Sequence, residues 1–337
     1  MHTGLVKIGL IGCGYWGNNL ARNIFKSDKA ELTAVFDMRP EAAEAFGRQY
    51  PDSSVAEDLN TLLQDTTLDA LALATPASTH FDLAREAIRH GKHVLVEKPA
   101  SQTSAEISEL HQLARDTGKV FMVDHTYLYS GPIACIKELL DQEELGSINY
   151  VQSIRINLGK VQPDINVVWD LATHDISIIN HLLGKTPISV QVSSASHLPN
   201  GRENMAFLSL YYPNNAIAHI HVSWSSPVKR REMLVGGDRK MLVYNDLVTT
   251  EKVALYDSGH DVVHQQDGIE VSYRNGEACH PDYDVSEPLQ NVINSFANAI
   301  LKGSQAPSKM PFDIGVIKVL EAAQQSIDSG GIKINLD

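Results

Sequence analysis

The stretch VKIGLIGCGYWG, residues 6–17, decides the fold of the first part of the chain. Its first half, Val6 to Ile11, is mostly apolar, which predicts a strand buried on both faces of a parallel sheet. Glycines follow at once, and Asn18 to Ser27 has the spacing of an amphipathic helix. A GxGxxG motif between a strand and a helix predicts a turn that binds a dinucleotide.

Each glycine of the motif has its own task. Gly12 permits the tight turn, Gly14 lets a pyrophosphate approach the backbone, and Gly17 lets the helix pack on the strand. The unpaired N–H groups at the helix start would hold the phosphates. Tyr15 and Trp16 lie inside this turn and are expected to contact the cofactor.

An acidic residue stands where the adenosine ribose should bind. Asp37 follows the second predicted strand and comes 20 residues after Gly17. Its carboxylate would accept hydrogen bonds from the ribose hydroxyls and repel a 2'-phosphate, so NAD is favoured over NADP. Met38 and Arg39 follow and are further candidate contacts, and Arg39 leaves open a pairing with a 2'-phosphate.

The rest of the first third alternates strands and helices, which is the rhythm of βαβ units. The further expected strands are Leu32–Phe36, Leu68–Leu73, His93–Val96 and Val120–Val123. The expected helices are Pro40–Tyr50, Thr79–His90 and Ser104–Thr117. We therefore expect an α/β domain, a doubly wound parallel sheet, over residues 1–123.

Residues 124–337 have a different pattern, which predicts a second, α+β domain with a large, mostly antiparallel sheet. The expected strands are Ile148–Leu158, Ile188–Ser194, Ala206–Tyr212, Ala216–Trp224, Glu232–Gly236, Lys240–Tyr244, Val253–Tyr256 and Ile332–Leu336. The expected helices are Pro132–Leu140, Leu171–Leu183, Glu287–Leu301 and Asp313–Ser329, the last packing back on the body.

Composition narrows the functional classes. The chain has 337 residues and a formal net charge of −13, which disfavours nucleic acid and anionic membranes as partners. Its 3 cysteines show no paired spacing and no zinc-site pattern, so we expect a reduced compartment and no metal. Neither a signal peptide nor an apolar run of about 20 residues is evident, and we expect a cytoplasmic protein.

Polar residues follow two neighbouring strands, at the edge where a doubly wound sheet gathers its ligands. Thr75 and Pro76 follow one strand, and Glu97, Lys98 and Pro99 follow the next. A dinucleotide bound at the glycine turn would reach this edge.

Four motifs together, GCGYWG, ATPASTH, EKP and WDLATHD, resemble the glucose-fructose oxidoreductase, inositol dehydrogenase and rhizopine-catabolism (Gfo/Idh/MocA) superfamily. The resemblance covers the whole chain in order and spacing. It implies a nicotinamide-dependent sugar or cyclitol oxidoreductase with a lysine and a DxxxH pair around the reacting alcohol. Those residues are Lys98, Asp170 and His174 here, and Thr75, Pro76, His80 and Glu97 are the implied cofactor contacts. The resemblance also suggests a cis bond between Lys98 and Pro99.

The residue types support this assignment independently. Oxidation of an alcohol needs a base for the hydroxyl proton, and an imidazole with a reference pKa near ~6.5 suits that task, so His174 is our base. Lys98 would stabilise developing alkoxide character. Asp170, four residues before His174 on one helical face, would orient the imidazole or bind a hydroxyl.

Structural roles remain alternatives for all three. Asp170 could be only a helix N-cap, Lys98 a surface lysine and His174 a structural histidine. Asp175 is an anomaly, because helical projection puts it on the apolar side and the sequence names no partner for it.

Candidate substrate contacts lie around the histidine helix. Arg155 and Asn157 share one face of a predicted strand that ends near Lys160, and Trp169 precedes Asp170 and could stack on a ring or belong to the core. Lys229, Arg230 and Arg231, with Arg239 and Lys240, form a basic cluster that could hold a diphosphate or be a solvated strand pair. His125 and Tyr127, in the stretch VDHTY, complete the candidate set.

The WDLATHD and VDHTY stretches look most like members that oxidise the 3-hydroxyl of UDP-N-acetylglucosamine or its uronic acid. A free sugar, sugar phosphate or inositol is the enzymatic alternative, and a dinucleotide-binding regulator without turnover is the alternative of another class. Apolar residues on both faces of strand Ala206–Tyr212 predict a homodimer or homotetramer.

Overall fold

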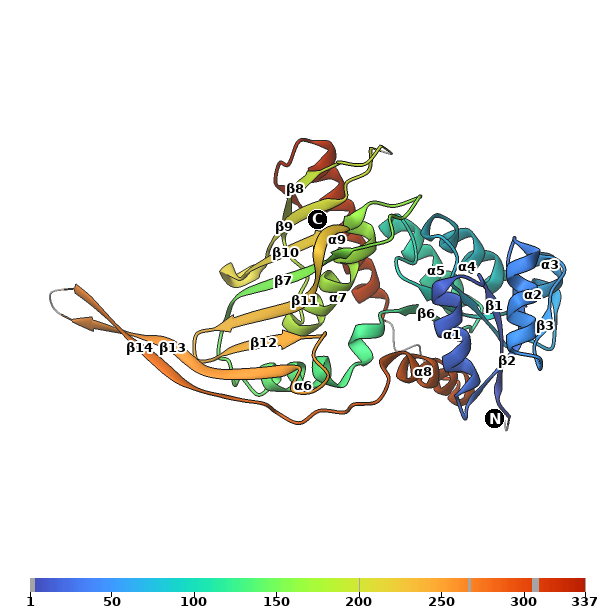
Figure 1. Cartoon of the computed structure of the whole chain (residues 1–337), viewed down its shortest axis with the longest axis horizontal. Helices are drawn as coiled ribbons and strands as arrows, with labels where there is room; N and C mark the ends of the chain where they lie inside the picture. Colours follow the sequence, from blue (N-terminus) through green and yellow to red (C-terminus); the bar gives the residue numbers. More distant parts are fainter. Residues whose placement is uncertain (1–3, 200, 266–267, 305–308, 337) are drawn as a thin grey trace. The chain divides into compact units, whose positions relative to one another are not determined.

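The computed structural model describes residues 4–199, 201–265, 268–304 and 309–336, without the side chains of 261–270. The chain divides into two compact units, coloured along the sequence in Figure 1. The first comprises Met1–Tyr129 and Ser286–Ile317, and the second Ser130–Val285 and Lys318–Asp337. No helix of the described residues is long and apolar enough to cross a bilayer.

The first unit contains a parallel sheet with strand order β3-β2-β1-β4-β5-β6. The strands are β1 (Val6–Ile11), β2 (Ala30–Phe36), β3 (Ser54–Val55), β4 (Ala70–Leu73), β5 (His93–Glu97) and β6 (Phe121–Asp124). The order reverses between β1 and β4, where ligands bind in doubly wound sheets. The predicted fold class of this part is confirmed.

Helices connect these strands. They are α1 (Tyr15–Phe25), α2 (Pro40–Gln49), α3 (Leu59–Gln64), α4 (His80–Arg89) after the short helix η1 (Ala77–Thr79), and α5 (Ser104–Asp116), with η2 (Thr126–Tyr129) at the end. Local chemistry sets their starts: Pro40 occupies the first turn of α2, and Thr103 and Glu106 form a reciprocal capping box at α5. The short elements β3 and α3 were not predicted, because each has few residues with which to show a period.

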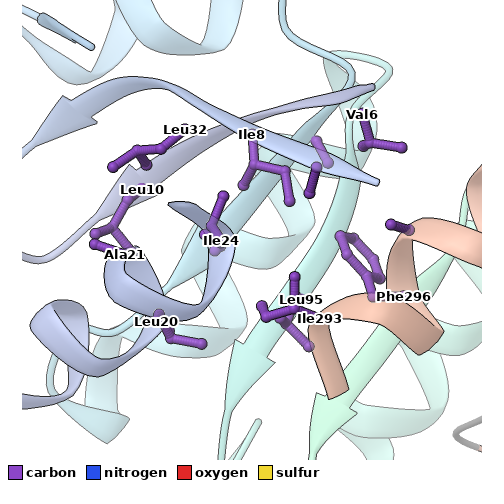
Figure 2. Close-up of a cluster of buried hydrophobic side chains, with 14 of the residues drawn as sticks. Val6, Ile8, Leu10, Leu20, Ala21, Ile24, Leu32, Leu95, Ile293 and Phe296 are labelled. Atoms are coloured by element: carbon purple, nitrogen blue, oxygen red, sulfur yellow. The ribbon is translucent and has the colours of Figure 1, made fainter. Parts of the chain in front are cut away.

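A later segment completes the core of this unit. Helix α8 (Pro288–Lys302) inserts Ile293 and Phe296 among the side chains of β1 and α1, as Figure 2 shows. Arg22 of α1 donates hydrogen bonds of 3.0 and 2.5 Å to the Glu287 carboxylate just before α8. The predicted boundary after residue 123 therefore differs from the structural division, in which 286–317 belongs with the first unit. Local patterns cannot reveal which core an amphipathic helix joins.

The second unit contains a nine-stranded sheet in which, among the residues that the structure describes, only β10 and β7 pair in parallel. Its order is β14-β13-β12-β11-β7-β10-β9-β8-β15. The strands are β7 (Ile148–Leu158), β8 (Ser189–Ala195), β9 (Met205–Tyr211), β10 (Ile217–Ser223), β11 (Ser225–Gly237), β12 (Met241–Asn245), β13 (Val253–Gln265), β14 (Gly268–Cys279) and β15 (Ile334–Asn335). The mostly antiparallel sheet was predicted correctly.

The helices of this unit are α6 (Gly131–Asp141), the π-helix η3 (Val168–Ala172), α7 (Thr173–Leu183) and the short η4 (Pro213–Asn215). Helix α9 (Met310–Asp328) contributes its later part, and the division between the units falls within it. Buried apolar residues of α7, such as Ile176, Ile178 and Ile179, make it a core helix.

The hairpin of β13 and β14 extends beyond the rest of the sheet (Figure 1). Strand β12 pairs only with the first residues of β13, Val253 to Tyr256, so the outer part is a ribbon of two strands. Only Val253–Tyr256 was predicted here from the sequence, and β14 was missed, although Ile269, Val271 and Tyr273 alternate with polar residues as in a half-buried strand.

Candidate active site

The glycine turn has the shape that a dinucleotide needs. Gly12 has φ of 101°, a conformation open to glycine, and a Cβ at Gly17 would lie 2.0 Å from the carbonyl oxygen of Gly12. A Cβ at Gly14 would meet nothing within 4 Å, so that side of the turn is open. Two glycines are thus required by the protein itself, and the third borders space where a pyrophosphate fits.

The start of α1 supplies the groups that would hold the phosphates. Gly14 is the N-cap and has no side chain with which to satisfy the first N–H groups. Tyr15 and Trp16 project from this turn with 77% and 40% of their surfaces exposed. The turn and both aromatic residues therefore border solvent, as their predicted role requires.

Asp37 lies at the end of β2 and is tied to the turn. Its Oδ2 accepts from the backbone N–H of Cys13 at 2.8 Å, and its Oδ1 accepts from the backbone N–H of Arg39 at 2.9 Å. Burial favours the neutral acid, but these hydrogen bonds and the Arg39 guanidinium outweigh it and lower the pKa of Asp37. The carboxylate is thus ionised and fixed where a ribose would bind.

The guanidinium of Arg39 donates hydrogen bonds to this carboxylate. Its Nε lies 3.0 Å from Oδ1 of Asp37 and its Nη2 lies 3.2 Å from Oδ2. The side chain is 62% exposed, so it can leave without disturbing a core. Met38 between them is 90% exposed. Asp37, which would accept a hydrogen bond from a ribose hydroxyl, and Arg39, which would pair with a 2'-phosphate, therefore form an ion pair with each other.

His80 connects two loops at the carboxyl edge of the first sheet. Its Nε2 lies 2.8 Å from the carbonyl oxygen of Thr75, and its Nδ1 lies 2.8 Å from that of Pro99. The imidazole is 1% exposed. Pro76, which is exposed, lies in the first of these loops. His80 was predicted as a cofactor contact, but its ring nitrogens hold protein backbone instead.

Glu97 is the last residue of β5 and Lys98 follows it, and both are buried, at 6% and 8% exposure. The bond between Lys98 and Pro99 is cis, which confirms that prediction. Burial, followed by the charge of Asp124, raises the pKa of Glu97 well above its ordinary value. Lys98 is thus a lysine buried at a strand end, and the surface-lysine alternative is wrong.

The second unit carries Asp170 and His174. Asp170 lies inside the π-helix and His174 at the start of α7, so the segment is not one regular α-helix from Leu171 onward. A π turn is often found at functional sites. The N-cap of α7 is Ala172 and that of η3 is Val167, so the N-cap alternative for Asp170 is wrong.

A tryptophan fixes the carboxylate of Asp170. Trp224, just after β10, donates from Nε1 to Oδ2 of Asp170 at 2.9 Å. His174 is half-buried, and Ser177 donates to its backbone oxygen at 2.8 Å. The predicted pair therefore belongs to one helical segment whose first turns are anchored by hydrogen bonds.

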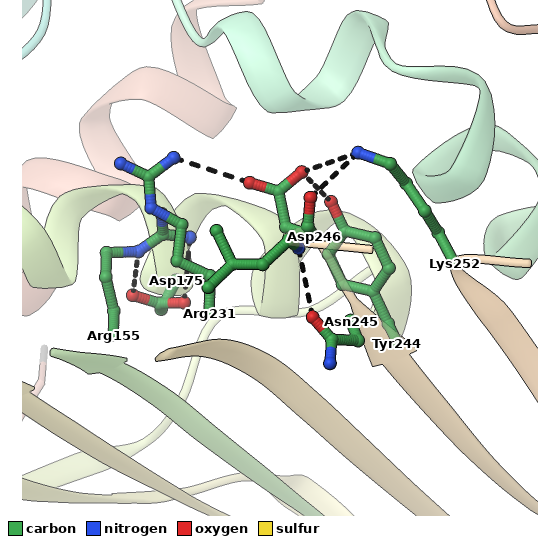
Figure 3. Close-up of polar contacts among 8 residues, drawn as sticks. Arg155, Asp175, Arg231, Tyr244, Asn245, Asp246 and Lys252 are labelled. Atoms are coloured by element: carbon green, nitrogen blue, oxygen red, sulfur yellow. Dashed lines mark hydrogen bonds and ion pairs between the residues drawn. The ribbon is translucent and has the colours of Figure 1, made fainter. Parts of the chain in front are cut away.

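Asp175, the acidic residue on the apolar side, is explained by Arg155. Nε of Arg155 donates to Oδ2 of Asp175 at 2.7 Å (Figure 3). Ser153 donates to Oδ1 of the same carboxylate at 2.7 Å. The side chains of Arg155 and Asp175 are 6% and 2% exposed. Arg155 was predicted to contact substrate, but its guanidinium instead forms this buried ion pair with Asp175.

Two further residues that were predicted to contact substrate are buried and hydrogen-bonded to other side chains of the protein. Trp169 is 8% exposed and donates from Nε1 to Gln324 at 3.2 Å. His125 is 6% exposed, and its Nε2 lies 3.2 Å from Oδ1 of Asp313. Both positions favour structural roles over substrate contact. The other candidates are a half-buried Tyr127, a half-buried Asn157 and an exposed Lys160, and they remain predictions.

Three of the five side chains in the basic cluster pair with carboxylates of the described residues. Arg230 pairs with Glu232 at 2.5 Å, Arg231 with Asp246 at 3.4 Å, and Lys240 with Glu144 at 2.7 Å. Figure 3 shows Asp246 held between Arg231 and Lys252. The pairing of Arg230, Arg231 and Lys240 supports the strand-pair interpretation over a diphosphate site.

Sequence reasoning missed the supporting residues. Asp124 directly follows the last apolar residues of β6, a position that could have been recognised as the end of a parallel strand. Trp224 and Asp313 meet their partners, Asp170 and the histidines His111 and His125, only through the tertiary fold.

Comparison with known families gives the class. Residues 6–125 match the model described as an oxidoreductase family with an NAD-binding Rossmann fold, and residues 133–243 match the GFO/IDH/MocA C-terminal domain. The chain belongs to the Gfo/Idh/MocA oxidoreductase family. The predicted NAD-binding domain and the enzyme class are thereby confirmed.

Individual relatives share low sequence identity with this chain. An uncharacterized oxidoreductase of Streptococcus pneumoniae is 26% identical, aligned over 68% of this chain and 65% of that protein. Inositol 2-dehydrogenase of Rhizobium meliloti is 23% identical over 96% of this chain and 97% of its own. The structure of UDP-N-acetylglucosamine 3-dehydrogenase GnnA from Acidithiobacillus ferrooxidans has a TM-score of 0.78 at 22% identity, covering 96% of this chain and 98% of that one. This last likeness shows the fold alone.

Proposed function

We propose that this oxidoreductase removes hydride from a secondary alcohol of a sugar, with NAD as acceptor, and that the alcohol is the 3-hydroxyl of UDP-N-acetylglucosamine or a related UDP-amino sugar. The observation that carries the reaction type is the anchored pair of Asp170 and His174, with Asp170 held by Trp224 at 2.9 Å. Lys98, which is buried in the unit that contains the glycine turn, is the other residue of the family pattern.

Each residue has a role that follows from its chemistry. Bound NAD supplies the hydride acceptor. His174 takes the hydroxyl proton, since a neutral imidazole is a competent base near neutral pH. Lys98 stabilises negative charge on the substrate oxygen, which is worth most in a buried setting. Asp170 holds the imidazole or a neighbouring hydroxyl in place.

The substrate part of the proposal rests on sequence motifs and on the likeness to GnnA, a UDP-N-acetylglucosamine 3-dehydrogenase. An inositol or unactivated sugar is the second candidate, favoured by the full-length likeness to inositol 2-dehydrogenase. The pairing of the basic cluster with Glu232, Asp246 and Glu144 removes one argument for a diphosphate. The substrate is therefore to be identified by measuring which of these compounds the protein oxidises.

The test measures absorbance at 340 nm with NAD and a panel of UDP-N-acetylglucosamine, its uronic acid, glucose 6-phosphate, glucose and myo-inositol. NADH formation confined to a UDP-sugar supports the proposal. Turnover confined to an unactivated polyol keeps the mechanism and overturns the substrate. Tight NAD binding without turnover, repeated with an aminotransferase present to consume a ketone product, supports the non-catalytic regulator.

Two variants test the mechanism. His174→Ala should lower kcat by about 10²- to 10⁴-fold, the usual contribution of a general base, with NAD affinity unchanged. Lys98→Ala should also lower kcat. Unchanged turnover in His174→Ala would remove the assigned base. Glu57→Gln, a change at an exposed residue of the first unit, is the control and should leave kcat unchanged.

We also propose that the chain forms a homodimer or homotetramer through the open face of the nine-stranded sheet. Ala206, Leu208 and Leu210 of β9 are buried, whereas Phe207 is 48% exposed. Phe207 stacks on His221 of β10 at 4.3 Å between ring centroids. An aromatic surface of this kind favours self-association. Light scattering should give more than one chain per particle, and Phe207→Glu should lower that number; a monomeric wild type would contradict the proposal.

A further inference from the structure

Two carboxyl groups meet at the carboxyl edge of the first sheet. Glu97 is the last residue of β5, Asp124 is the last residue of β6, and the strand register pairs them directly. Paired residues of neighbouring strands point to the same face, so the two side chains are neighbours. Their exposed fractions are 6% and 0%.

Each of these carboxyl groups has an oxygen that the described residues leave unsatisfied. Oε1 of Glu97 and Oδ2 of Asp124 are buried without a hydrogen-bond donor among the described residues. Ionised carboxylates only accept hydrogen bonds, so two of them side by side repel and cannot satisfy each other. A single proton makes one carboxyl a donor to the other and satisfies both oxygens.

We propose that Glu97 and Asp124 share one proton, carried by Glu97 and donated to Asp124, so that the pair bears one negative charge. A hydrogen bond from Thr126 to Asp124 favours Glu97 as the residue that carries the proton. The threonine hydroxyl donates to Oδ1 of Asp124 at 2.8 Å, which favours the ionised form of Asp124. Asp124 is then a positioning residue that holds Glu97, the residue next to Lys98.

The surrounding charges agree with this assignment. Burial and then the charge of Asp124 raise the pKa of Glu97, and the opposing charge of Lys98 is outweighed. Burial also raises the pKa of Asp124, against the hydrogen bonds from Thr126 and Glu97 and the charges of His125 and Lys98. Two further titratable groups are linked to these residues: burial and then the charge of Asp124 raise the pKa of the Tyr129 phenol, and Asp313 is hydrogen-bonded to His125.

The shared proton matters for the role of Lys98, and this consequence rests on the proposed function. With one proton, the pair balances one ammonium charge. With none, it would place two negative charges beside Lys98 and weaken the stabilisation of an alkoxide. The pair therefore keeps Lys98 electrostatically available for the substrate oxygen around neutral pH.

The test is infrared spectroscopy of the full chain without substrate, so its outcome does not depend on the proposed activity. At neutral pH the wild type should show the carbonyl stretch of a protonated carboxylic acid, and that band should shift when glutamate side chains carry ¹³C. Glu97→Gln should remove the band, and Glu57→Gln, an exposed glutamate of the same unit, should retain it. No ¹³C-sensitive band in the wild type would overturn the proposal even if Glu97→Gln failed to fold.

Asp124→Asn tests the partner. Removing the negative charge should lower the pH at which the Glu97 band disappears, because the charge of Asp124 helps to keep Glu97 protonated. A purely structural Asp124 would leave this titration unchanged, and that result would overturn its positioning role. Both infrared readouts are independent of whether the protein oxidises a UDP-sugar, a polyol or neither of them.

Discussion

The guanidinium of Arg155 and the carboxylate of Asp175 form a buried ion pair between β7 and α7, with 2.7 Å between Nε and Oδ2. Arg155 stands directly opposite Arg231 in the pairing of β7 with β11, and Arg231 has its own carboxylate in Asp246. Two adjacent arginines are thus each neutralised by a separate acid (Figure 3).

Asp175→Asn should destabilise the protein by about 3–5 kcal/mol, because it leaves the charge of Arg155 buried without its counter-charge. The double variant Arg155→Met with Asp175→Leu should recover most of this loss. Urea denaturation followed by fluorescence measures both. Glu44→Gln, which breaks an exposed pair with Arg48, should cost less than about 1 kcal/mol, and a similar loss at both sites would refute the argument.

Gly14→Ala and Gly17→Ala should separate cofactor binding from folding. A Cβ at position 17 would lie 2.0 Å from the carbonyl oxygen of Gly12, so Gly17→Ala should lower both stability and NAD affinity. A Cβ at position 14 meets nothing within 4 Å, so Gly14→Ala should melt like the wild type but bind NAD roughly tenfold more weakly or worse. Thermal melting and calorimetric titration with NAD provide the comparison. Equal melting temperatures for the two variants would contradict it.

Arg39→Ala and Asp37→Asn should change cofactor preference in opposite directions. Asp37→Asn should weaken NAD binding by about 1.5–3 kcal/mol, the usual worth of a hydrogen bond to a charged group. Arg39→Ala removes the guanidinium hydrogen bonds from both carboxylate oxygens of Asp37, so it should leave NAD affinity equal or higher and lower the affinity for NADP. Dissociation constants for both dinucleotides measure this. A loss of NAD affinity in Arg39→Ala would show that the guanidinium itself binds NAD.

The buried Glu97 should make stability depend on pH in a defined direction. Because its pKa is raised in the folded protein, its contribution is full below the unfolded value near ~4.3 and is lost as pH rises through the folded value. Glu97→Gln cannot lose a proton, so its stability relative to the wild type should increase between pH 4 and neutrality, on the scale of about 1.4 kcal/mol per unit of pKa shift. Urea midpoints at several pH values measure the difference. A difference that does not vary with pH would exclude a raised pKa for Glu97.

The sequence by itself determined the features that rest on local patterns. The glycine turn, the acid at Asp37, the parallel sheet and the antiparallel character of the second sheet all follow from periods and spacings within a few tens of residues. The DxxxH pair could be recognised from its motif. These features are readable because neighbours in sequence are neighbours in the structure.

Only the tertiary structure decided which side chains satisfy one another. Arg155 lies 20 residues from Asp175, Trp224 lies 54 from Asp170, and α8 joins a core formed by the first strands of the chain. A buried charge or polar group must find a partner, but strand register and helix packing select that partner and leave no local pattern. For this reason Arg155 and His125, which were predicted to bind substrate, instead make contacts inside the protein.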